Sequence, residues 1–132
     1  MGKFTKDQDL QVNYIKPQFD VEWEEANRYS YFEKLGQAGW EELASKGKVI
    51  TLTTDSIKKI GNTGADGSES LDDLEPDKVA RLQKAMDSGI VEMPIVVKQP
   101  NGSFDLVAGN TRLIGLMNTH GEAQVWLVDA SG

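Results

Sequence analysis

The residues with the clearest chemical potential lie in one turn, Ala108-Gly109-Asn110-Thr111-Arg112. The glycine lets the backbone bend sharply or approach a ligand closely. A helix that starts here presents backbone N–H groups without intrahelical partners and the positive end of its dipole, and both suit a phosphate. Thr111 adds a hydroxyl, and Arg112 adds a cation whose forked donors match phosphate oxygens. The turn therefore predicts a phosphate site, although a capped turn with a solvated arginine explains the same residues.

Acidic residues upstream of this turn are the second group of interest: Glu69, Asp72, Asp73, Glu75 and Asp77. Hard cations take oxygen ligands, but the spacing is not that of a calcium loop, and such a run is more commonly a solvated helix start. Asp72, Asp73 and Glu75 stay as candidates for a base or for a magnesium ligand beside a triphosphate. The sequence assigns no catalytic residue and no metal site built from protein ligands alone.

Three further features are weaker. The glycine-rich stretch Gly61–Gly67 is not a Walker loop, because no Gly-Lys-Ser/Thr follows it, so it is either a lid or a long connection. The tripeptide Gly-Asn-Thr occurs at 61–63 and again at 109–111, which is too short to define a repeat. His120, the single histidine, precedes a glycine and fits a helix cap better than a catalytic group.

Composition limits the class of protein. A chain of 132 residues with 39% hydrophobic content predicts one domain with a modest core. The absence of cysteine excludes disulfides, thiolate metal sites and cysteine nucleophiles, and it fits a cytoplasmic location. No segment approaches the ~20 apolar residues of a membrane span, and no signal peptide is visible. A net charge of −7 argues against a domain that grips nucleic acid through a basic surface.

The elements that must position the turn form an α/β pattern. Residues 1–47 predict a helical N-terminal extension that begins with an unstructured arm, Met1–Asp20, and contains aromatic residues at helical spacing. Residues 48–132 predict an α/β (α+β) domain with a small mixed sheet. Its expected elements are a strand at Val49–Thr53, a helix from Glu75-Pro76-Asp77 to Ser88-Gly89, strands at Met93–Lys98 and Ser103–Ala108, a helix at Arg112–Thr119 and a strand at Glu122–Asp129.

This order resembles the ParB/sulfiredoxin superfamily from about Ile50 to Asp129. The resemblance rests on a proline–acid–lysine helix start at Pro76-Asp77-Lys78, a strand Pro94-Ile95-Val96-Val97, a hairpin, and a Gly-x-x-Arg turn that opens a helix. It implies that Gly109, Asn110, Thr111 and Arg112 contact phosphate and that Lys78 contacts the nucleotide. The implied cofactor is ATP or CTP with magnesium.

The turn departs from two branches of that family. Sulfiredoxins have Gly-Cys-His-Arg there, with the cysteine as nucleophile; Asn110 takes its place, so sulfinic acid reductase activity is excluded. Chromosome-partition ParB proteins have Gly-Glu-Arg-Arg and continue into a helix-turn-helix DNA reader. With the chain ending at Gly132, binding to a centromere-like operator is not expected.

Three functions follow as expectations. The first is a free-standing nucleotide-binding domain, as a nucleotide-dependent phosphotransferase or a nucleotide hydrolase. The second is a non-enzymatic, nucleotide-gated accessory module that contacts DNA or a protein. A ParB-like nuclease is a further alternative to the first. The third is an interaction protein that kept the fold and lost the site, for which Arg112→Ala would change stability by only a few tenths of a kcal/mol. The resemblance also suggests an origin in a phage or mobile element.

Overall fold

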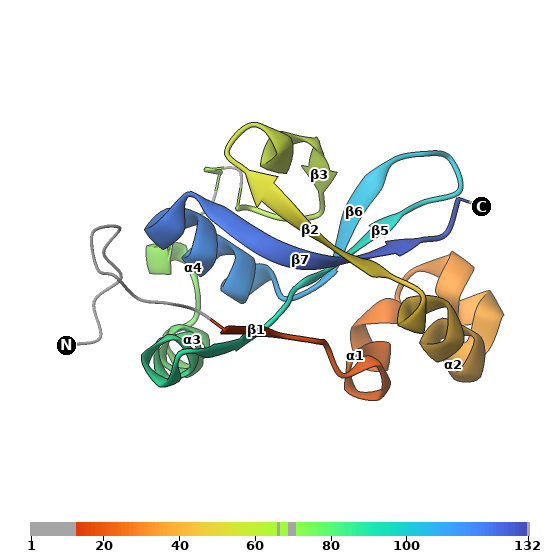
Figure 1. Cartoon of the computed structure of the whole chain (residues 1–132), viewed down its shortest axis with the longest axis horizontal. Helices are drawn as coiled ribbons and strands as arrows, with labels where there is room; N and C mark the ends of the chain where they lie inside the picture. Colours follow the sequence, from red (N-terminus) through yellow and green to blue (C-terminus); the bar gives the residue numbers. More distant parts are fainter. Residues whose placement is uncertain (1–12, 66, 69–70, 132) are drawn as a thin grey trace.

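The fold is mixed α/β, which confirms the predicted class. The structure is a computed structural model, and it describes residues 13–65, 67–68 and 71–131. Within these residues a five-stranded sheet has the order β2-β7-β5-β6-β3, and a two-stranded sheet pairs β1 with β4 (Figure 1). The strands are β1 (Asn13–Ile15), β2 (Lys48–Thr53), β3 (Ile60–Gly61), β4 (Ile90–Glu92), β5 (Ile95–Lys98), β6 (Phe104–Ala108) and β7 (Glu122–Asp129). The helices are α1 (Phe19–Ala26), α2 (Ser30–Ser45), α3 (Pro76–Ser88) and α4 (Asn110–His120), with 3-10 turns η1 (Ser56–Lys59) and η2 (Leu71–Asp73).

The large sheet is built around β7 and β5. Strand β7 pairs antiparallel with β2 and parallel with β5, and β5 pairs antiparallel with β6. The three residues Ile95, Val96 and Val97 are completely buried, as expected for a central strand that is covered on both faces. Figure 1 shows α3 and α4 grouped on one side of the molecule and α1 and α2 on the other.

Two hydrophobic cores fill the two faces of this sheet. Alternate residues of β7 serve each face: Val125 belongs to the core under α3 and α4, and Trp126 to the core under α1 and α2. The second core is aromatic, with Phe32 and Trp40 completely buried and their ring centroids 4.8 Å apart. The indole N–H groups of Trp40 and Trp126 donate to the carbonyls of Phe19 and Ala44. The aromatic residues of the N-terminal helices therefore pack in the core.

The predicted unstructured arm is wrong where the structure describes it. Strand β1 pairs parallel with β4, and the Met93 N–H donates to the carbonyl of Ile15 at 3.0 Å. Residues 1–12 of that prediction lie outside the described residues. Strands of three residues carry too little alternation to be recognised in a sequence, which explains why β1 and β4 were not predicted.

The other boundaries follow their local signals closely. Helix α3 begins at Pro76 and ends before Gly89, whose φ of 79° is the left-handed cap that glycine provides. Gly36, with φ 81°, interrupts the helical geometry inside α2. In the described part of the chain, no helix combines the length and the apolar character that a membrane crossing requires.

Candidate functional site

The turn between β6 and α4 has the geometry that its glycine predicts. Gly109 has φ 94° and ψ 29°, and its carbonyl accepts the Leu113 N–H at 2.8 Å. A Cβ atom on Gly109 would lie 2.9 Å from both Cα and Cβ of Pro94. Glycine is therefore required both for the left-handed conformation and for the close approach of β5. The turn is thereby held against the central sheet.

Helix α3 packs against α4 at Gly115. A Cβ atom on Gly115 would overlap a methyl carbon of Leu82, so the absence of a side chain there makes room for this leucine between the two helices. Leu113, Ile114 and Leu116 anchor the buried face of α4. The first turn of α4 is left partly exposed beside α3.

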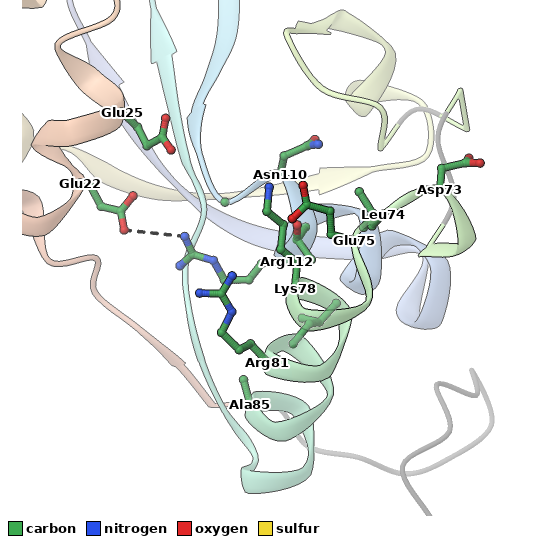
Figure 2. A pocket seen from close by; sticks show the side chains of 13 residues that line it. Glu22, Glu25, Asp73, Leu74, Glu75, Lys78, Arg81, Ala85, Asn110 and Arg112 are labelled. Atoms are coloured by element: carbon green, nitrogen blue, oxygen red, sulfur yellow. Dashed lines mark ion pairs between the residues drawn. The ribbon is translucent and has the colours of Figure 1, made fainter.

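A pocket of about 650 Å³ lies at this place, between α1, α3 and the start of α4 (Figure 2). All five residues predicted from the sequence as phosphate- or nucleotide-contacting line it: Lys78, Gly109, Asn110, Thr111 and Arg112. The other lining residues are Glu22, Glu25, Asp73, Leu74, Glu75, Arg81, Leu82 and Ala85. Segments that are far apart in the chain thus contribute to one cavity, and α1 of the N-terminal region is one of its walls.

Arg112 is held by two carboxylates. Its Nη1 donates to the carbonyl of Glu92 at 3.0 Å and lies 3.4 Å from Oε1 of the same residue, while Nη2 lies 3.9 Å from Oε1 of Glu22. The exposed side-chain fractions are 23% for Arg112, 23% for Glu92 and 13% for Glu22. Because the network is partly buried, loss of one partner would leave an uncompensated charge, and Arg112 is not a simple solvated cation.

Glu22 is electrostatically the most unusual group of the pocket. Burial raises the pKa of its carboxyl above the ordinary value, and Arg112 opposes that rise. The nearby carboxylates of Glu92 and Glu25 raise the pKa further, as does a side-chain hydrogen bond with Glu92. Two carboxylates that share one guanidinium cannot both be fully compensated, which adds to the effect of burial on this pKa.

The α3 wall is different, because its charged side chains are exposed. Lys78 is exposed, and Arg81 forms only an exposed ion pair with Asp77, at 3.9 Å. Figure 2 shows Lys78 and Arg81 on α3 across the pocket from Glu22 and Glu25 on α1. Such exposed pairs contribute little to stability, so these cations are available to a ligand at low cost.

The acidic candidates are divided by the structure. Asp73 and Glu75 line the pocket, Asp72 is exposed and is not among the lining residues, and Glu69 lies outside the described residues. Across residues 13–65, 67–68 and 71–131, no three histidine, cysteine, aspartate or glutamate side chains are grouped so that they could hold a metal ion. His120 ends α4 and does not line the pocket.

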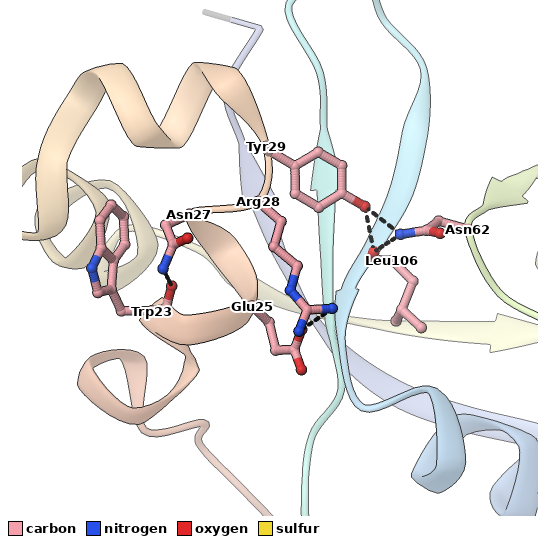
Figure 3. A network of polar contacts seen from close by, with 7 residues as sticks. All are labelled: Trp23, Glu25, Asn27, Arg28, Tyr29, Asn62 and Leu106. Atoms are coloured by element: carbon pink, nitrogen blue, oxygen red, sulfur yellow. Dashed lines mark hydrogen bonds and ion pairs between the residues drawn. The ribbon is translucent and has the colours of Figure 1, made fainter.

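The two Gly-Asn-Thr tripeptides meet at the turn. The Thr63 hydroxyl donates to Oδ1 of Asn110 at 2.6 Å, and the Gly64 N–H donates to the same oxygen at 3.3 Å. Asn62, with φ 61°, donates its amide to the Tyr29 hydroxyl at 2.8 Å and to the carbonyl of Leu106 at 3.2 Å (Figure 3). The start of the glycine-rich stretch is therefore fastened to the turn and to the N-terminal region.

Four charged residues of this site were not predicted: Glu22, Glu25, Arg81 and Glu92. The spacing of Glu22 and Glu25 puts them on one helix face, and Arg81 follows Lys78 by one turn. Those local signals say nothing about which elements meet in space. The contact of α1 and β4 with Arg112 is a tertiary feature that no spacing in the sequence encodes.

The chain matches no protein-family model, no curated protein and no solved structure. The geometry of the pocket is therefore the basis for the function proposed below.

Proposed function

We propose that this pocket binds a nucleoside di- or triphosphate of the ATP or CTP type together with magnesium. The observation that carries the proposal is that five residues selected from the sequence as phosphate contacts line one cavity. Its volume of about 650 Å³ falls within the range of roughly 300–1,000 Å³ that is typical of small-molecule sites. The resemblance to the ParB/sulfiredoxin superfamily points to the same ligand class.

The expected roles follow from position and charge. The first backbone N–H groups of α4 and the helix dipole favour phosphate oxygens beside Gly109. Lys78 reaches the phosphates from α3 as an exposed, flexible cation, and Arg112 supplies a second cation, which Glu22 and Glu92 hold in the free protein. Magnesium usually takes one or two carboxylates and completes its shell with phosphates and water, and Asp73 and Glu75 are the carboxylates that line the pocket on the α3 side.

If the site turns its ligand over, the reaction is phosphotransfer or nucleotide hydrolysis, in which positioning and charge stabilisation do most of the work. A non-enzymatic, nucleotide-gated module for a DNA or protein partner is the second candidate. The observation in its favour is that Glu22 of α1 and Glu92 of β4 already hold Arg112. A phosphate that draws Arg112 away from Glu22 would weaken the contact between α1 and α4. The ligand would then favour a conformation in which this contact is broken, and so shift the conformational equilibrium.

The test is a calorimetric titration of ATP, ADP and CTP with magnesium. We expect micromolar binding, about −8 kcal/mol, by at least one nucleotide. Lys78→Ala should weaken that binding about tenfold, which corresponds to ~1.4 kcal/mol. Lys84→Ala is the matched control, because Lys84 is exposed on the same helix and does not line the pocket.

Arg112→Ala is a poorer test of binding, because it also removes the partner of two partly buried carboxylates. No binding heat with any nucleotide, on folded protein, would overturn the proposal. Equal losses in Lys78→Ala and Lys84→Ala would place the ligand elsewhere.

A further inference from the structure

A cluster of two acidic side chains and one basic side chain lies at one wall of the pocket. Glu22 from α1 and Glu92 from β4 contribute two carboxylates, and Arg112 from α4 contributes the single guanidinium that contacts both. With both acids ionised the cluster has a charge of −1. All three side chains are less than one-quarter exposed, so solvent screens this charge poorly.

The neighbours of Glu22 show how the imbalance is distributed. The charged groups that act on Glu22 are Arg112, Glu92 and, one helical turn along α1, Glu25. Glu25 is partly occupied by Arg28, which lies 3.1 Å from its carboxylate. Glu22 has no cation other than Arg112 among the ion pairs of the described residues, and at 3.9 Å that contact is longer than the contact of Arg112 with Glu92. Glu22 is therefore the weaker-held acid of the pair.

A phosphate at the α4 turn would act on Glu22 in two ways. It would bring negative charge to the pocket that Glu22 lines. It would also attract the guanidinium of Arg112, because bidentate phosphate contacts are among the strongest that arginine makes. Both effects disfavour the ionised form of Glu22. Uptake of a proton by its carboxyl removes the uncompensated negative charge.

We propose that Glu22 is the acid–base residue of this site and that an anionic phosphate ligand binds together with one proton taken up by the Glu22 carboxyl. This inference rests on the proposed function, because it requires a phosphate ligand at the α4 turn. It goes further by assigning a role to a residue of the N-terminal region and a pH dependence to the binding. In the free protein, burial raises the pKa of Glu22, Arg112 opposes the rise and Glu92 adds to it, so a ligand that competes for Arg112 acts in the same direction as burial.

The consequence is a ligand affinity that decreases as the pH rises. When binding takes up one proton, the dissociation constant increases by up to about tenfold per pH unit. The dependence is present above the pKa of Glu22 in the free protein and below its pKa in the complex. By reciprocity, the factor by which protonation of Glu22 strengthens phosphate binding equals the factor by which bound phosphate strengthens proton binding to Glu22.

Calorimetry of Mg-ATP or Mg-CTP in two buffers of equal pH and different ionisation enthalpy measures the proton uptake directly. Three proteins are compared: wild type, Glu22→Gln and Glu24→Gln. Glu24 is the matched control, because it is an exposed carboxylate of the same helix that does not line the pocket. The free ligand ionises identically in all three titrations, so the difference between the proteins reports the change made by the substituted glutamate.

At a pH between the pKa of Glu22 in the free protein and its pKa in the complex, we expect wild type and Glu24→Gln to take up more protons than Glu22→Gln, by up to one proton. The affinity of Glu22→Gln should exceed that of wild type at pH 8 and should depend less on pH. Binding heat with equal proton uptake in all three proteins overturns this inference and leaves the phosphate site intact. Absence of binding heat in the wild type overturns the phosphate site itself and this inference with it.

Discussion

The charged groups on the two walls of the pocket differ in how firmly they are held. On the α3 wall, Arg81 and its partner Asp77 are each 74% exposed. On the α1 wall, Glu22 is 13% exposed and is tied to Arg112, which Glu92 also holds. The exposed charges of the α3 wall are therefore expected to act on the ligand, and the partly buried charges of the α1 wall to act on both the ligand and the fold. Substitutions on α3 should change ligand affinity with little effect on folding, whereas substitutions in the cluster of Glu22, Glu92 and Arg112 should affect both.

The turn that both walls share should be the most sensitive position. Gly109→Ala forces a left-handed conformation on alanine and places its Cβ 2.9 Å from Pro94, so we expect a loss of about 2–4 kcal/mol in unfolding free energy. Gly102→Ala is the control, because Gly102 has φ 90° but no atom lies within 4 Å of the place that a Cβ would take, and it should lose about 1 kcal/mol. Urea denaturation measures both values. Equal losses would contradict the close approach of the turn to β5.

The next prediction compares an arginine from each environment. Arg112→Met leaves Glu22 and Glu92 as partly buried acids without their cation, so we expect a loss of about 1–3 kcal/mol in unfolding free energy. Arg81→Met removes only an exposed ion pair and should change it by less than about 0.5 kcal/mol. Guanidinium chloride screens charge, so urea is the better denaturant. If Arg112→Met cost no more than Arg81→Met, the two walls would not differ as described.

The brace behind the turn should have a smaller effect. Thr63→Val removes the hydroxyl that donates to Asn110 and accepts the Ala65 N–H, so we expect a loss of about 1 kcal/mol. Thr51→Val, at an exposed position of β2, serves as the control and should change stability by less than about 0.5 kcal/mol. Thermal unfolding followed by circular dichroism distinguishes the two, and a neutral Thr63→Val would show that Asn110 does not need this support.

The smallest effect concerns the pH dependence of stability. The pKa of Glu22 is raised above its ordinary value of 4.5, so the native state keeps this proton to a higher pH than the unfolded state. Wild type should therefore lose stability relative to Glu22→Gln as the pH rises from about 4.5 through the raised pKa, and the difference should be constant above it. Urea denaturation of both proteins between pH 4 and pH 8 measures this difference. A difference that changes in the opposite direction would mean that the pKa is lowered.

The sequence predicted the parts of the site that depend on local chemistry. Gly109 marked the strand-to-helix turn, Pro76 and Gly89 marked the ends of α3, and the alternation in Glu122–Asp129 marked β7 with its observed bounds. These signals work because a cap, a positive φ or a two-residue period acts within a few neighbours.

The remainder of the site depends on contacts between distant segments. Glu92 lies 20 residues from Arg112 in the chain, and Glu22 lies in a region that was predicted to be a separate helical extension. Strands β1 and β4, which place Glu92, are too short to show a period. The cluster of Glu22, Glu92 and Arg112 therefore depends on the packing of α1, β4 and α4 against one another, which the local sequence does not specify.

The central claim, a phosphate ligand at the start of α4, is tested most directly by following backbone amide resonances during a titration with Mg-ATP or Mg-CTP. We predict saturable shifts of the amides of Gly109, Thr111 and Arg112 with one dissociation constant, reduced in affinity by Lys78→Ala and unchanged by Lys84→Ala. The amide of Gly102, on the hairpin outside the pocket, should not shift. Shifts confined to other elements, or no shift at the α4 turn at millimolar nucleotide, would contradict the account.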